Sequence, residues 1–69
     1  MKKEQMLWIA TKYKSKGYSQ ESMRDGDDCY HLSGVEGRAI KDEIAEYMDE
    51  IDEIGRVAFY EKYKNFRLY

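Results

Sequence analysis

Residues 33–58 read SGVEGRAIKDEIAEYMDEIDEIGRVA, and this stretch decides the fold class. Apolar side chains recur in it at steps of three and four residues: Ile40, Ile44, Tyr47, Met48, Ile51, Ile54 and Ala58. At 100° per residue they fall within an arc of about 120°, which is typical of a helix that packs against a core. Ser33 and Glu36 have the spacing of a capping box, so we expect the helix to begin there.

The aromatic residues after Gly55 do not continue this apolar stripe. In the same helical phase, Phe59, Tyr63 and Phe66 would point about 80° to 140° away from its centre. They would then need a different neighbour. We therefore expect a helix through about residue 64 that is bent or broken at Gly55.

A second helix is predicted for residues 2–16. Its apolar residues again recur at three and four residue steps, with Leu7 at the edge of the stripe: Met6, Ile9, Ala10 and Tyr13. Gly17 is the residue type that ends helices. Residues 18–33 have no usable period, so we expect a loop with one helical turn, N-capped by Ser19.

The chain has 69 residues, no proline and one cysteine, Cys29. We predict one all-α domain over residues 1–69, a small helical hairpin or three-helix domain with one long capped helix. In it, helix 2–16 lies antiparallel to the long helix. The stripe from Ile40 to Ala58 is longer than helix 2–16 can cover, so we also expect a homodimer through it. With no disulfide framework, signal peptide or membrane span, we expect a cytoplasmic protein.

The loop resembles a calcium-binding loop only in part. Its acids occupy the first, third and twelfth positions of that loop: Asp25, Asp27 and Glu36. Tyr30, however, stands where the sharp turn requires glycine. We therefore predict no calcium site.

Cys29 and His31 are the other candidates for chemistry. They are too few to close a structural zinc site, and no third residue is placed to orient them as nucleophile and base. We predict no metal, no cofactor and no enzymatic activity.

The formal net charge of −2 hides a segregated layout. Residues 1–16 carry five bases and one acid, net +4, and residues 17–35 carry one base and four acids, net −3. Residues 36–55 carry two bases and eight acids, net −6, and residues 56–69 carry four bases and one acid, net +3. The ordinary interpretation is that the basic ends pack beside the acidic helix and neutralise it.

A second interpretation is that these acids bind another protein. Seven carboxylates lie on the polar side of the long helix, and four of them stand towards its C-terminal end, where the helix dipole disfavours acids: Asp49, Glu50, Asp52 and Glu53. We assign the partner contact to the row between residues 46 and 53: Glu46, Asp49, Glu50 and Glu53. Such a row suits docking on a basic protein surface. Trp8 lies opposite the stripe of its helix, so it either folds over the C-terminal aromatic residues or is an exposed anchor for the partner.

From these features we predict a non-enzymatic adaptor or inhibitor whose acidic helix docks on a basic partner, such as a nucleic-acid-handling protein. The alternative is a nucleic-acid-binding protein, because bases alternate with aromatic residues near the C-terminus. Its contacts would come from two basic segments: Lys12, Lys14, Lys16, Lys62, Lys64 and Arg67. We do not expect membrane binding.

Overall fold

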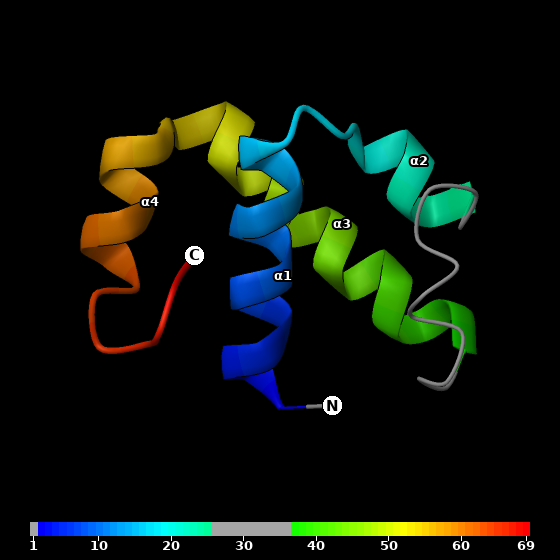
Figure 1. Ribbon diagram of the computed structural model, residues 1–69, viewed down its shortest axis with the longest axis horizontal. Coiled ribbons are helices and arrows are strands. Elements are labelled where there is room, and N and C mark those ends of the chain that lie inside the picture. Colours follow the sequence, from blue (N-terminus) through cyan, green and yellow to red (C-terminus); the bar gives the residue numbers. More distant parts are fainter. Residues whose placement is uncertain (1, 26–36) are drawn as a thin grey trace.

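The computed structural model describes residues 2–25 and 37–69. Over these ranges the chain forms four helices and no strand: α1 (Lys3–Ser15), α2 (Gln20–Asp25), α3 (Gly37–Ile54) and α4 (Arg56–Lys62) (Figure 1). The all-α prediction is confirmed. The predicted capping box and the candidates Asp27, Cys29 and His31 lie outside the described residues.

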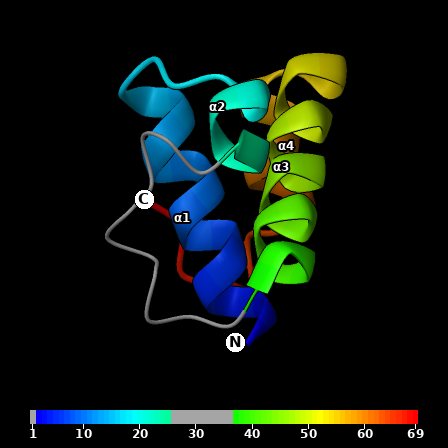
Figure 2. The ribbon, with the colours of Figure 1, turned by 90° about the vertical axis from the view of Figure 1, so that its right-hand side faces the viewer.

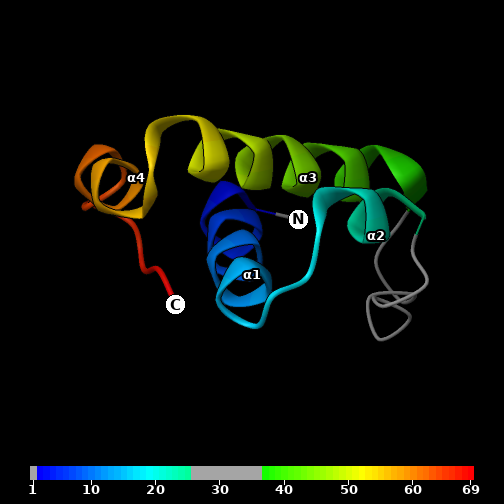
Figure 3. The same ribbon diagram turned by 90° about the horizontal axis from the view of Figure 1, so that it is seen from above.

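Helix α3 is the element on which the others assemble. Both α1 and α2 pack against it, on the same side, and α4 continues beyond its end (Figure 3). Helices α1 and α3 both rise from bottom to top in Figures 1 and 2, so the predicted antiparallel arrangement is wrong. Residues 16–36, which include α2, separate the two helices in sequence, whereas only a short loop would force antiparallel neighbours.

The core lies between the inner side of α3 and the helices that cover it. Its buried apolar residues come from all four helices and the turn after α4: Met6, Leu7, Ala10, Tyr13, Met23, Ile44, Ala45, Met48, Ile51, Phe59 and Tyr63. The middle of the predicted stripe, Ile44 to Ile51, is therefore covered within a single chain. This removes the argument that its excess length calls for a homodimer.

Helix α1 ends as predicted at Gly17. This glycine has a φ of +87°, its N–H donates to the Lys14 carbonyl at 3.1 Å, and the Tyr18 N–H donates to the Tyr13 carbonyl at 3.0 Å. These two bonds form a Schellman motif. The Tyr13 and Tyr18 rings, 5.0 Å apart, supply its apolar contact. Ser19 then caps α2, since its Oγ accepts the Ser22 N–H at 3.1 Å.

Gly55 breaks the predicted long helix in two. Its φ of +89° and ψ of 155° belong to a region that is almost restricted to glycine. Its N–H closes the last turn of α3 on Ile51, and its carbonyl accepts the Phe59 N–H at 3.0 Å to begin α4. The change of direction turns Phe59 and Tyr63 into the core, as the aromatic pattern required.

The segment after α4 returns to α1 (Figure 1). The Tyr69 N–H donates to Oγ1 of Thr11 at 2.9 Å, while the Thr11 hydroxyl can itself donate to the Trp8 carbonyl, also at 2.9 Å. Lys3 places its ammonium 5.5 Å from the ring centre of Tyr63. Helix α1 is thus covered by α3 on one side and by the C-terminal segment on another.

Candidate functional site

The outward side of α3 carries only acids between residues 42 and 53. At 100° per residue, six residues fall within an arc of about 120° opposite the buried Ile44 and Met48. We call these six the acidic face: Asp42, Glu43, Glu46, Asp49, Glu50 and Glu53. The four predicted partner-binding carboxylates are therefore brought together on one surface.

One edge of the acidic face is neutralised by α2. The Arg24 guanidinium lies 2.8 Å from Oδ2 of Asp49. The hydrogen bond lowers the pKa of Asp49 below its ordinary value and raises the pKa of Arg24. Asp49 is still half exposed, with 49% of its side chain accessible. The ion pair neutralises Asp49 at this edge of the acidic face but leaves its carboxylate accessible to solvent.

Beside this edge, Asp52 is bound by α1 and α2 together. Lys14 Nζ lies 2.8 Å from its Oδ1, and Gln20 Nε2 donates to its Oδ2 at 2.5 Å. Both hydrogen bonds lower the pKa of Asp52, that of Lys14 more strongly. Asp52 therefore serves to hold α1 and α2 on α3.

The other edge of the acidic face is bound by residues at the end of α4 and in the turn after it. Glu50 accepts hydrogen bonds from Lys62 Nζ and from the Tyr63 hydroxyl, the latter at 2.8 Å. Burial of Glu50 works against its ionisation, but the bonds from Lys62 and Tyr63 outweigh burial and lower its pKa. The pKa of Tyr63 is raised, first by burial and then by its bond to this carboxylate.

The negative potential of the acidic face also reaches Tyr47. Burial raises the pKa of this phenol, and the charges of three carboxylates add to the effect: Glu43, Glu50 and Glu46. The carboxylates therefore act together at one place on the surface.

Glu46 and Glu53 form the middle of the acidic face, and we call this pair the acidic ridge. Both are exposed, and within the described ranges no hydrogen bond or ion pair reaches either carboxylate. They are seven residues apart, which places them on the same side of α3 and about 10 Å apart along its axis. Two acids therefore stand outward between two edges that the protein itself has neutralised.

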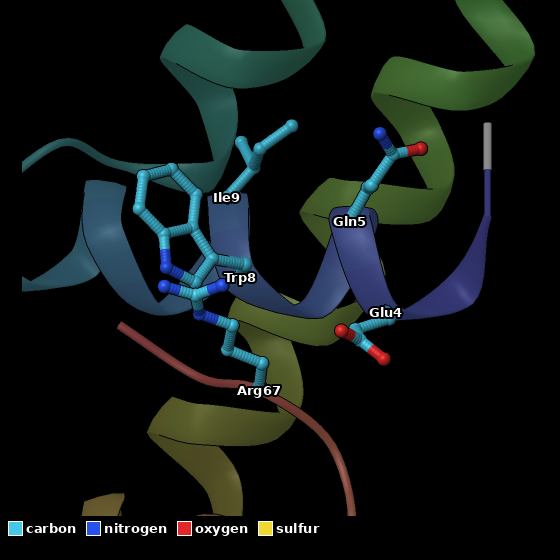
Figure 4. Close-up of a pocket in the computed structure, with 5 residues that line it drawn as sticks. All are labelled: Glu4, Gln5, Trp8, Ile9 and Arg67. Atoms are coloured by element: carbon cyan, nitrogen blue, oxygen red, sulfur yellow. The ribbon is translucent and has the colours of Figure 1, made fainter.

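Trp8 is half-buried and folds over the C-terminal segment, which is the first of its two predicted interpretations. Its ring meets Tyr69 edge-on with centres 5.5 Å apart, and Lys12 Nζ lies 5.0 Å from its centre. A shallow hollow of about 480 Å³ lies beside it (Figure 4), lined by Glu4, Gln5, Trp8, Ile9 and Arg67. In Figure 4 the Arg67 and Trp8 side chains lie together at one end of the hollow and Glu4 lies at the other. No structural feature singles out Trp8 as a free anchor.

Of the six bases of the nucleic-acid alternative, only Lys12 and Arg67 are brought together, both beside Trp8. Lys14 and Lys62 are committed to Asp52 and Glu50. Lys12 lies over Trp8, whereas Lys16, Lys64 and Arg67 are exposed. Lys16 follows the upper end of α1 and Lys64 follows the lower end of α4 in Figure 1, so these two bases do not form one track.

Thr11 and Gln20 make structural contacts that were not predicted from the sequence. Thr11 accepts the C-terminal segment, and Gln20 joins α2 to Asp52. A threonine on the edge of an apolar stripe is a weak signal of a buried hydroxyl, because the same residue is as common on exposed helix surfaces. For Gln20 the sequence carries no such signal.

Two features are absent from the residues that the structure describes. Among them, no cluster of three or more His, Cys, Asp or Glu side chains has the geometry to hold a metal ion. Likewise, no helix in this part of the chain has both the length and the apolarity needed to cross a bilayer.

Compared with known proteins, the chain matches no protein-family model, no curated protein and no solved structure.

Proposed function

We propose that this protein is a non-enzymatic binding protein, of the adaptor or inhibitor kind, that docks its acidic face on a basic surface of another protein. The observation that carries the proposal is the acidic ridge. Every outward residue of α3 between 42 and 53 is an acid, yet among the side chains that the structure describes, internal cations reach only the two edges.

The arrangement is unfavourable for the isolated chain. Glu46 repels both Asp42 and Glu50 at four-residue spacing, and Asp49 repels Glu53 in the same way. A basic partner would convert this repulsion into attraction. Such contacts speed association and discriminate against acidic surfaces, and they weaken as salt screens them. We therefore assign the acidic ridge to partner recognition rather than to stability.

The nucleic-acid alternative has less support. Phosphates would be repelled by the acidic face, and two of the six proposed contacts, Lys14 and Lys62, already bind carboxylates of α3. Of the remaining four, Lys12 and Arg67 lie beside Trp8, whereas Lys16 follows the end of α1 and Lys64 follows the end of α4, so the bases do not form one track.

A double charge reversal tests the proposal. Glu46→Lys with Glu53→Lys removes the acidic ridge, and both side chains are exposed, so the helix content by circular dichroism should not change. Glu4→Lys with Glu21→Lys is the matched control, because it alters net charge equally at exposed acids away from the acidic face. The immobilised wild-type chain should retain a basic protein from native cell extract and release it as salt is raised.

The ridge variant should lose that protein and the control should keep it, as identified by mass spectrometry. Equal retention by both variants would contradict the proposal. Titration with DNA and RNA at two salt concentrations separates the alternative. Salt-sensitive binding that survives in the ridge variant but disappears in Lys16→Glu with Lys64→Glu would favour nucleic acid.

A further inference from the structure

The outer side of α4 is a second surface that the packing leaves open. Val57 is 81% exposed, the highest value among the large apolar side chains in the described part of the chain. Tyr60 lies half-buried next to it. A hollow of about 470 Å³ joins these two residues to three charged ones: Arg56, Glu61 and Lys64. We call these five residues the α4 face.

The turn of the helix explains why this side is uncovered. Phe59 and Tyr63 point into the core, and Val57 and Glu61 are about 160° from Phe59 at 100° per residue. In Figure 3, α4 stands at the end of the molecule, away from α2, and no described element lies beyond it. An exposed valine beside a half-buried tyrosine, both bordered by charged residues, is a composition that suits a contact surface.

The residues of one α4 helix are complementary to those of a second, antiparallel copy of α4. When two copies of α4 are placed antiparallel about a two-fold axis between residues 58 and 59, residues whose numbers sum to 117 face one another. Arg56 then faces Glu61 of the partner subunit, and Val57 faces Tyr60 of the partner subunit. The axis repeats both pairs, so four contacts arise from one helix of each copy.

We propose that the α4 face binds a second copy of this chain in this antiparallel arrangement. Neither charge is satisfied within one chain: Arg56 and Glu61 are five residues apart on the helix, about 140° around it. Across the described residues no ion pair reaches either of them.

The contact is small, so the dimer belongs with weak and transient associations. It is independent of the proposed function, because the acidic ridge is not part of it. Val57 is also separate from the Ile44 to Ile51 stretch that the core covers. This proposal therefore places self-association on a different surface from the seam expected from sequence.

Sedimentation equilibrium over a concentration series up to about 1 mM tests the proposal. The wild-type chain should shift from monomer towards dimer as concentration rises. Val57→Lys should weaken dimerisation by about tenfold or more, because it removes both apolar contacts between Val57 and Tyr60 of the partner subunit and brings a hydrated ammonium into the interface. Val57 is too exposed for this change to affect folding, which circular dichroism checks.

A charge swap gives the sharper test. Arg56→Glu alone and Glu61→Arg alone should each weaken the dimer, because each creates two like-charge contacts. The double variant should restore dimerisation to within a few-fold of the wild type. Lys16→Glu is the matched control for Arg56→Glu and should leave association unchanged.

Three results would overturn the proposal: a wild-type chain that stays monomeric over the whole series, a dimer indifferent to Val57→Lys, or a double variant as weak as the singles. The first would leave the α4 face to a partner of another kind. The second would place the dimer on another surface.

Discussion

Helices α1 and α3 show two ways in which an amphipathic sequence is used. Helix α1 is covered from more than one side, and its buried residues extend from Met6 and Tyr13 around to Thr11. Helix α3 is covered on one side only and is acidic on the other. The contrast explains why the apolar stripe is clear in α3 and blurred in α1, since a helix enclosed by several neighbours has no single outward side.

The difference also separates structural charges from those open to a partner. Lys14 of α1 turns its charge to α3, and Lys3 lies over aromatic rings of the C-terminal segment. Within the described part of the chain, the acidic face of α3 is paired with internal cations only at its edges. A helix with one free side is therefore the element on which a recognition surface can form without loss of the core.

The largest expected effect on stability comes from a substitution in α1. Leu7 lay at the edge of the predicted stripe but is fully buried. Leu7→Ala should reduce the free energy of unfolding by about 2–5 kcal/mol, measured by urea denaturation followed by circular dichroism. Glu46→Ala on the free side of α3 should change it by less than about 0.5 kcal/mol.

If Leu7→Ala leaves too little folded protein to measure, Leu7→Met gives a milder test of the same site, with a loss below about 1.5 kcal/mol. An effect of Leu7→Ala no larger than that of Glu46→Ala would contradict the view that α1 is enclosed.

A smaller effect is expected where the C-terminal segment meets α1. Thr11→Val removes the acceptor for the Tyr69 N–H and should cost about 1 kcal/mol. Because Tyr69 lies against Trp8, the tryptophan fluorescence should change as well. Thr11→Ser keeps the hydroxyl and should retain the wild-type spectrum. Unchanged fluorescence and stability in Thr11→Val would show that the bond does not hold the segment.

The smallest effect concerns acid pH. The pKa values of Asp49, Asp52 and Glu50 are lowered in the folded protein, the first two chiefly by hydrogen bonds from Arg24 and Lys14. As pH falls through the ordinary values of 3.8 for Asp and 4.5 for Glu, the unfolded chain takes up protons first. The stability that these groups supply is therefore complete above about pH 5 and lost below it.

Thermal melting between about pH 6 and pH 3 should show the midpoint falling by a few degrees. Since the three carboxylates hold α1, α2 and α4 on α3, the double variant Lys14→Gln with Arg24→Gln should have a flatter profile. The same acid sensitivity in that variant would assign the loss to other carboxylates.

The features that could be predicted from the sequence are those with local physical causes. The stripe of α3, the glycine that ends α1 and the break at Gly55 were predictable, because each depends on residues close in sequence. The direction of α1 relative to α3 was not, because the length of a connection does not fix its path. Trp8 had two interpretations, and only the position of Tyr69 chose between them.

For the candidate site, the sequence by itself determined that one side of α3 is acidic, since helical periodicity places Glu46, Asp49, Glu50 and Glu53 together. Only the tertiary structure decided which of these acids have internal partners. Arg24, Lys14 and Lys62 are distant in sequence from the carboxylates they bind, and their pairing depends on how the helices pack. Periodicity is a local property of the backbone, whereas an ion pair between helices exists only once the core has brought them together.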